Sequence, residues 1–168
     1  MNRATELKQY FLYNPKTGSF RWKKHRCACF VGKKAGCLGR ANGYWLLSLH
    51  NKKILGHIAA WALSYGEWPR FHIDHKNLQK DDNRLSNLRP SNKSNNGANR
   101  PPQKNNTSGY KGVFWHIGGQ KWMAQIRVRN KLCYLGLFDS KVAAAKAYDE
   151  KAIEAFGEHA RCNLLEAA

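Results

Sequence analysis

The sequence predicts an α+β protein with two small domains, the second a three-stranded antiparallel sheet packed on one helix. Three observations lead to this prediction. Short runs of alternating apolar and polar residues, typical of strands, lie between Gly, Asn and Pro turn signals. Two apolar stretches with helical spacing each end at a glycine. A polar segment with two adjacent prolines separates the halves, so we expect domains at residues 1–99 and 109–168 and a linker at 100–108.

The elements expected in the first domain are short. Leu7, Tyr10 and Phe11 have helical spacing and indicate a helix over residues 6–13. An apolar helical stretch ends at Gly66. In chain order we expect a helix at 6–13, a turn at 14–18, a strand at 19–23, a basic loop to about 40, a strand at 44–49, a turn at 51–53 and a helix at 56–65.

The elements expected in the second domain form a simpler series. Three strands are predicted at residues 110–114, 122–128 and 132–138, with turns at 118–119 and 130–131. A long amphipathic helix follows over 140–156, with Ser140 as its N-cap and Gly157 at its end. Such a sheet and helix make a unit of about the smallest size that folds alone.

Charge is the strongest signal in the composition. The chain has 29 Lys and Arg against 11 Asp and Glu, a formal net charge of +18. Repulsion among so many cations favours an anionic partner, and nucleic acid is the usual one. No apolar run approaches the roughly 20 residues that span a bilayer, and the first ten residues lack the apolar core of a signal peptide. We therefore expect no membrane partner, no obligatory protein partner and a cytoplasmic location.

Five cysteines are present, and an odd number without a secretion signal argues against a disulfide framework. Cys27, Cys29 and Cys37 could hold zinc only with a fourth ligand such as His25. Their spacing is unlike that of a structural zinc knuckle. Exposed loop cysteines are the favoured interpretation, and zinc stays the alternative.

Residues 70–99 are polar, rich in Asn and Asp, and contain few apolar anchors. Within them Asp74-His75 precedes Asn87 by twelve residues, and Asn96 follows nine residues later. A further cluster, Asp82-Asn83-Arg84, ends just before Asn87. Several fixed spacings agree at once, and the segment resembles the HNH endonuclease family, whose members have a ββα-metal fold. The resemblance implies that fold for the first domain.

The resemblance gives each residue a role that its chemistry suits. Asp74 and Asn96 would supply oxygen ligands to one divalent metal ion, Mg²⁺ in the first place and Mn²⁺ as an alternative. His75 would be the general base, because an ordinary histidine pKa of about 6.5 suits proton abstraction near neutrality. Asn87 would orient the loop that carries His75.

Two other histidines compete for attention. His72 is a rival for the role of base or metal ligand, although strand alternation places it on the face of Asp74, opposite His75. His57 begins the apolar helix, and we interpret it as structural or as a phosphate contact. Basic side chains around the motif are expected to contact DNA phosphates. These are Arg70, Lys76, Arg84, Arg89, Lys93 and Arg100.

A second resemblance covers residues 109–164. Tyr110-Lys111-Gly112-Val113, then Trp122 to Ile126, Tyr134 to Asp139, and finally Asn163-Leu164 are similar in order and spacing to the Apetala/ethylene-response-factor DNA-binding domain. In that family the sheet enters the major groove. The resemblance, with Arg129 added for its charge, implies DNA contacts from Lys111, Phe114, His116, Lys121, Gln125, Arg127, Arg129 and Tyr134.

Together these observations favour a metal-dependent, site-selective DNA endonuclease of the homing or free-standing phage type. It would leave 5′-phosphate and 3′-hydroxyl ends and nick double-stranded DNA as a monomer. A DNA-binding regulator without nuclease activity is the main alternative, and an RNA-binding protein is a weaker one.

Overall fold

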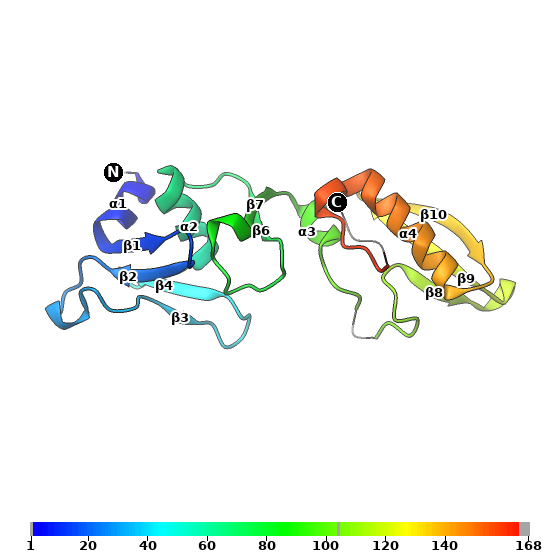
Figure 1. Cartoon of the computed structure of the whole chain (residues 1–168), viewed down its shortest axis with the longest axis horizontal. Coiled ribbons are helices and arrows are strands. Elements are labelled where there is room, and N and C mark those ends of the chain that lie inside the picture. The colour runs from blue at the N-terminus through cyan, green and yellow to red at the C-terminus, as the bar shows by residue number, and fades with distance from the viewer. Residues whose placement is uncertain (1, 104, 165–168) are drawn as a thin grey trace. The chain divides into compact units, whose positions relative to one another are not determined.

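The computed structural model describes residues 2–103 and 105–164, and the chain divides into two compact units, Met1–Ser91 and Asn92–Ala168 (Figure 1). Helices and strands occur in both, so the α+β prediction is confirmed. The division falls between the two strands and the helix of the HNH-like motif, eight residues before the predicted end of the first domain. The domains expected at residues 1–99 and 109–168 and the linker expected at 100–108 stay predictions. No helix in the described part of the chain is long and apolar enough to cross a membrane.

The first unit begins with a helix and a strand pair, followed by a three-stranded sheet, a second helix and another strand pair. Its elements are α1 (Arg3–Tyr10), β1 (Phe11–Asn14), β2 (Ser19–Trp22), β3 (Cys37–Leu38), β4 (Trp45–Leu49), β5 (Lys52–Leu55), α2 (Gly56–Tyr65), β6 (His72–His75) and β7 (Leu88–Ser91), with short 3-10 turns at Ala28–Phe30 and Leu85–Asn87. β1 pairs with β2, β4 lies between β3 and β5, and β6 pairs with β7, all antiparallel.

Two predicted elements of the first unit were misplaced, the helix expected at 6–13 and the turn expected at 51–53. The first helix starts earlier than expected because the Asn2 side chain accepts a hydrogen bond from Ala4 N, 3.2 Å away, and caps it. The helix then stops at Tyr10, since Phe11 to Asn14 alternate between buried and exposed and pair with β2. The turn expected at 51–53 lies at His50-Asn51, which both have positive φ, and β5 begins at Lys52.

The core of this unit packs α1, α2 and the strands together. α2 has the predicted bounds and ends at Gly66, whose φ is 79°. Three buried alanines on α2, Ala59, Ala60 and Ala62, allow close packing against Leu7, Phe11, Phe20 and Leu47.

The β1–β2 turn lies directly against the segment 83–85. Gly18 has φ of +70°, and a Cβ there would be 2.6 Å from Arg84 N and 2.7 Å from the Asn83 carbonyl carbon. Only glycine fits both the conformation and the space. The Tyr13 hydroxyl donates to Asn83 O at 2.7 Å, and Leu85 N donates to Pro15 O at 3.0 Å. This turn therefore supports the segment that precedes Asn87.

The second unit has a short helix, a sheet and a long helix. Its elements are α3 (Lys93–Ala98), β8 (Val113–His116), β9 (Lys121–Val128), β10 (Lys131–Phe138) and α4 (Lys141–Phe156), with short 3-10 turns at Ile117–Gly119 and Gly157–His159. β9 lies between β8 and β10, and both pairings are antiparallel. α4 packs on the sheet through Ala144, Ala145, Tyr148 and Ala152, so the predicted three-stranded sheet on one helix is confirmed.

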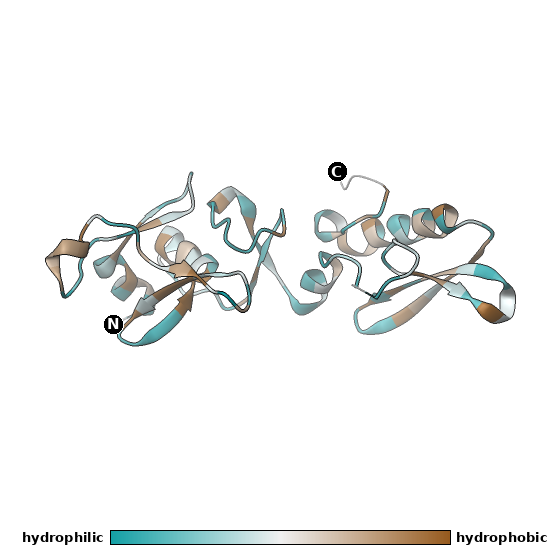
Figure 2. Cartoon of the chain, turned by 90° about the horizontal axis from the view of Figure 1, so that it is seen from below, coloured by the Kyte–Doolittle hydropathy of each residue, from teal (hydrophilic) through white to brown (hydrophobic). Residues whose placement is uncertain are grey.

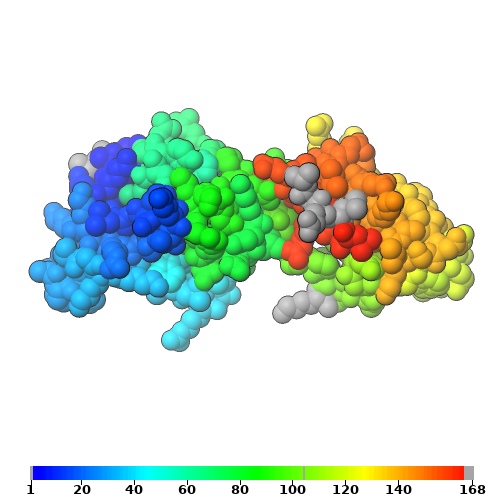
Figure 3. All heavy atoms as spheres, viewed as in Figure 1, coloured from blue at the N-terminus to red at the C-terminus, as the bar shows by residue number. Residues whose placement is uncertain are grey.

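Local signals define the ends of α4. The Ser140 hydroxyl accepts from Ala143 N at 3.1 Å, and Gly157 ends the helix, both as expected. Buried Asp149 accepts backbone hydrogen bonds from Asn163 and Leu164, each 2.7 Å long. The last described residues consequently lie beside α4, as the red and orange atoms of Figure 3 show.

Candidate functional site

The β6–β7 ladder presents the central residues of the HNH-like motif. Asp74 is opposite Arg89 and His75 is opposite Leu88 in its register. Along β6, His72 is exposed, Ile73 and His75 are buried, and Asp74 is partly buried. The two candidate bases therefore lie on opposite faces of the strand, as alternation predicts. His75 is the enclosed one, with 4% of its surface exposed.

The His75 ring packs among other rings. The centroid of the His57 ring is 5.1 Å away in an edge-to-face arrangement, and Tyr44 contacts both histidines. Burial lowers the pKa of His75, while a hydrogen bond with Asn83 and the nearby carboxylates, Asp74 first, oppose this shift. The imidazole is thus neutral near pH 7, the form that accepts a proton.

His57 lies beside His75, and the sequence did not predict that these two residues are close. Only 7% of it is exposed, so it lies inside the unit and away from any phosphate on the surface. Burial lowers its pKa to about 3, with a smaller contribution from His75. The only hint in the sequence is that a polar residue stands at the start of the otherwise apolar helix α2. The hydrophobic pattern does not show that this histidine is buried.

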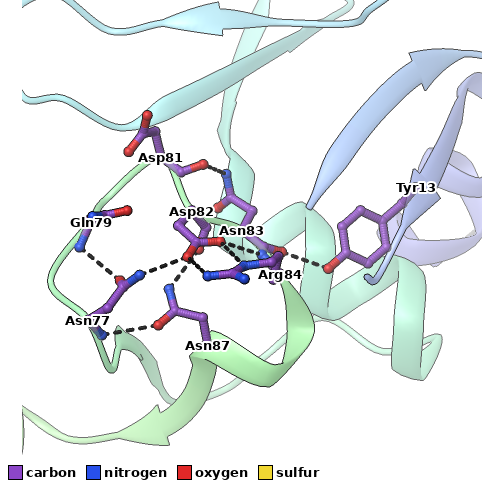
Figure 4. Close-up of polar contacts among 8 residues, drawn as sticks. All are labelled: Tyr13, Asn77, Gln79, Asp81, Asp82, Asn83, Arg84 and Asn87. Carbon is purple, nitrogen blue, oxygen red and sulfur yellow. Dashed lines mark hydrogen bonds and ion pairs between the residues drawn. The ribbon is translucent and has the colours of Figure 1, made fainter. Parts of the chain in front are cut away.

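Asn87 fixes the loop that follows His75 (Figure 4). Its Oδ1 accepts from Asn77 N at 3.0 Å, and its Nδ2 donates to Asp82 O at 2.8 Å. Its backbone carbonyl also accepts from Lys76 N at 2.9 Å. Both ends of its amide are thus bonded to loop backbone within seven residues of His75. The predicted role in orienting His75 stays a prediction that this geometry supports.

Asp82 organises the outer side of the same loop. Its carboxylate accepts from Arg84 Nε at 2.9 Å, Arg84 Nη2 at 2.7 Å and Asn77 Nδ2 at 2.7 Å. These bonds, those from Arg84 above all, lower the pKa of Asp82 to about 2. Arg84 keeps half of its side chain exposed, so this candidate phosphate contact is oriented by Asp82 and still faces solvent.

The candidate metal ligand Asp74 is paired with a cation from the opposite strand. Arg89 Nε and Nη2 donate to Asp74 Oδ2 at 3.1 and 2.9 Å. The Arg89 side chain is only 8% exposed. Arg89 was expected to contact DNA phosphate, and this expectation needs correction, because its guanidinium is buried against Asp74. Arg70, Lys76, Lys93 and Arg100 are exposed, as a phosphate contact requires.

The residues expected to hold a metal fit one by their chemistry. Asn96 lies on α3, and its Oδ1 is shielded from solvent without a hydrogen-bond donor in the described part of the chain. A bound cation would satisfy such a buried oxygen. Asp74 offers a carboxylate. Among residues 2–103 and 105–164 no three His, Cys, Asp or Glu side chains gather at one point.

Cys27, Cys29 and Cys37 lie on exposed segments of the first unit. The sulfurs of Cys27 and Cys29 are 2.7 Å apart, and Cys27 N donates to His25 Nδ1 at 3.1 Å. Zinc binding at these cysteines stays the untested alternative.

The sheet of the second unit presents most of the predicted DNA contacts on one face. Val113, Trp122, Ala124 and Ile126 belong to the clusters that pack on α4. Alternation along the strands puts the intervening residues on the other face. Figure 2 shows both teal and brown stretches along the strands of this sheet. The candidates on that face are Phe114, His116, Lys121, Gln125, Arg127 and Tyr134, while Arg129 lies in the exposed β9–β10 turn.

Lys111 departs from this arrangement. Its ammonium donates to the carbonyl oxygens of Gly97, 3.2 Å away, and Ala98, at the end of α3. The predicted contact between Lys111 and DNA stays a prediction, and the partners of its ammonium in the structure are these two carbonyls. Trp115 pairs with Trp122 across the sheet and lies edge-on to it, with a distance of 5.2 Å between the ring centroids, so packing explains its position.

Comparison with known protein families agrees with this site. Residues 55–98 match the family model described as HNH endonuclease, a span from α2 through the β6–β7 ladder to the end of α3. The match supports an HNH domain in this part of the chain, and with it a nuclease activity on DNA.

Proposed function

We propose that this protein is a divalent-metal-dependent, site-selective DNA endonuclease of the homing or free-standing phage type, acting in the cytoplasm of a bacterial host. One observation carries the proposal. His75 is held beside Asp74 on a strand whose following loop is hydrogen-bonded to Asn87, within the segment that matches the HNH family. A solvated polar loop would not need this arrangement.

The residues divide the chemistry among themselves. His75, neutral because it is buried, accepts a proton from the attacking water. The water oxygen bonds to phosphorus while the bond to the 3′ oxygen breaks, and the 3′ oxygen takes a proton from solvent water, which leaves 5′-phosphate and 3′-hydroxyl ends. Arg89 fixes the carboxylate of Asp74 through two hydrogen bonds to one oxygen.

Asp74 and Asn96 are the proposed metal ligands, Asp74 through its carboxylate and Asn96 through its buried amide oxygen. A divalent cation, when bound, would neutralise charge on the phosphate and stabilise the leaving oxygen. Mg²⁺ is the first choice and Mn²⁺ the second, because both ligands are oxygen atoms.

The second unit is the proposed DNA-positioning part, of the Apetala/ethylene-response-factor type. Its outer sheet face combines the cations Lys121 and Arg127 with the exposed ring of Tyr134. Cations provide salt-dependent affinity for phosphates, and exposed rings and amides provide contacts to bases. One catalytic histidine per chain favours a nick over a double-strand break when the protein acts as a monomer.

The test uses purified protein with supercoiled plasmid and with DNA of the organism that encodes it, in Mg²⁺ or Mn²⁺. We expect conversion to nicked circles, its loss in EDTA and its loss in His75→Ala. Sequencing the ends gives the target and the end chemistry. If wild-type protein binds these DNAs and cuts none in either metal, the endonuclease proposal fails and the regulator without nuclease activity replaces it.

A further inference from the structure

The backbone of Lys111 is held by hydrogen bonds, and its side chain extends from there to α3. Its backbone N–H donates to Asn163 Oδ1 at 2.7 Å, and its carbonyl accepts from Asn163 Nδ2 at 3.1 Å. Asn163 is held in turn by buried Asp149, which accepts from its N–H at 2.7 Å. The ammonium at the far end donates to the carbonyls of Gly97 and Ala98. Lys111 thus connects α3 to the body of the second unit through well-defined hydrogen bonds.

Helix α3 needs such outside support. It has six residues, and four of them are Ser, Asn or Gly, which are poor helix formers. So short a helix is unstable by itself in water. Its N-terminus is capped by Asn92, whose side chain accepts from Asn95 N at 2.9 Å. At its C-terminus the Lys111 cation meets carbonyls at the negative end of the helix dipole.

The partial burial of this position disfavours the charged form of a lysine. Desolvation lowers the pKa of Lys111 to about 8, and the neighbouring cations Arg161 and Arg100 add to this effect. A lysine meant to meet a phosphate would be expected on the exposed face, as Lys121 and Arg127 are by register. The α3 carbonyls therefore give the reason for a cation at this place.

α3 and the sheet also border a common cavity. A cavity of about 1010 Å³ is lined by Lys93 and Arg100 from α3 and the residues after it, and by Arg127 and Arg129 from the sheet. Lys111 lines the same cavity. Four other cations around one concavity make a surface that attracts the DNA backbone.

We propose that Lys111 is a positioning residue, which holds α3 and its Asn96 as part of the DNA-binding unit, so that binding of that unit to DNA also sets the position of Asn96. The inference rests on the proposed function for the meaning of Asn96. The connection between Lys111 and α3 itself does not depend on it.

Hydrogen exchange of the full-length protein without DNA tests the connection. Lys111→Met keeps the length of the side chain and removes the cation. Loss of one charge-assisted hydrogen bond raises the equilibrium constant for local opening about tenfold or more. We therefore expect amides of residues 96–100 to exchange at least about tenfold faster. Amides of β9 should be unchanged. Lys121→Met, a lysine on the outer sheet face, is the matched control and should leave α3 exchange at the wild-type rate. Equal α3 exchange in wild type and Lys111→Met overturns the proposal.

DNA binding and cleavage test the consequence. In EDTA, Lys111→Met should keep the wild-type salt dependence of DNA binding, whereas Lys121→Met should lower the slope of log K against log salt by about 1. At saturating DNA, Lys111→Met should need about tenfold more Mg²⁺ or Mn²⁺ for half-maximal cleavage, because Asn96 is held less firmly. A lower salt slope for Lys111→Met with an unchanged metal requirement would make Lys111 a DNA contact and contradict the proposal.

The two proposals fail in different ways. If wild-type protein does not cut DNA, the proposed nuclease function fails, while the exchange and salt-slope measurements still decide whether Lys111 holds α3. If the wild type cuts and α3 exchange is unaffected by Lys111→Met, the positioning role alone is refuted.

Discussion

Replacing Arg89 by methionine tests the ion pair beneath the candidate metal ligand. Arg89 donates to Asp74 Oδ2 from Nε at 3.1 Å and from Nη2 at 2.9 Å, and the two side chains are 8% and 13% exposed. Removing one partner of such a pair leaves an uncompensated charge away from water, which costs about 3–5 kcal/mol. A small domain has about 5–15 kcal/mol of stability in total. We therefore expect Arg89→Met to lower the free energy of unfolding of the first unit by about 3–5 kcal/mol.

Urea unfolding followed by tryptophan fluorescence measures this loss, in EDTA so that no metal binds Asp74. The matched control is the double variant Asp74→Asn with Arg89→Met, in which neither charge remains. Because no charge is left unpaired, its loss should be only about 1–2 kcal/mol. Arg89→Met within about 1 kcal/mol of the wild type would refute the reasoning, and so would a double variant as unstable as the single one.

Three further predictions follow from the site and the sheet. Asn87→Ala removes hydrogen bonds to Asn77 N and Asp82 O, so urea unfolding should show a loss of about 1–3 kcal/mol, and no loss would contradict the part of Asn87 in the loop. Arg127→Ala should weaken DNA binding and lower the salt slope by about 1, and an unchanged slope would count against the outer sheet face. Burial holds the pKa of His57 at about 3, below its value of about 6.5 in the unfolded chain, so acid favours the unfolded state, which binds the proton first. Stability should then fall by up to about 1.4 kcal/mol per pH unit between pH 6.5 and 4.5, and His57→Gln should fall less steeply over this range; equal slopes would show that His57 is not buried as a neutral ring.

Sequence patterns were most reliable where local chemistry decides the structure. Residues 56–65 and 140–156 form helices with the predicted ends because Gly66, Ser140 and Gly157 act on their own neighbours. The second and third strands of the second unit lie within one residue of the bounds predicted from alternation and turn residues, whereas the first, expected at 110–114, lies at Val113–His116. The alternation of His72 and His75 between the two faces of β6 could be predicted for the same reason.

Contacts between distant residues could not be predicted in this way. Phe11 fits the helical spacing of Leu7 and Tyr10, and pairing with β2 decides that it lies in a strand. Charge marked Arg89 and Lys111 as DNA contacts. In the structure their side chains bond to the Asp74 carboxylate and to the end of α3, which are 15 and 13–14 residues away. The sequence alone does not distinguish a basic side chain that faces solvent from one that donates to an acceptor inside the protein.

The single-turnover rate constant for DNA cleavage by His75→Ala and His72→Ala, each at saturating protein and Mg²⁺, tests the central assignment most directly. The buried and fixed imidazole of His75 as general base predicts a rate constant about 10²–10⁴-fold below wild type for His75→Ala, and one near wild type for His72→Ala. Normal cleavage by His75→Ala together with loss of cleavage in His72→Ala would contradict it and assign the base to the exposed face of β6.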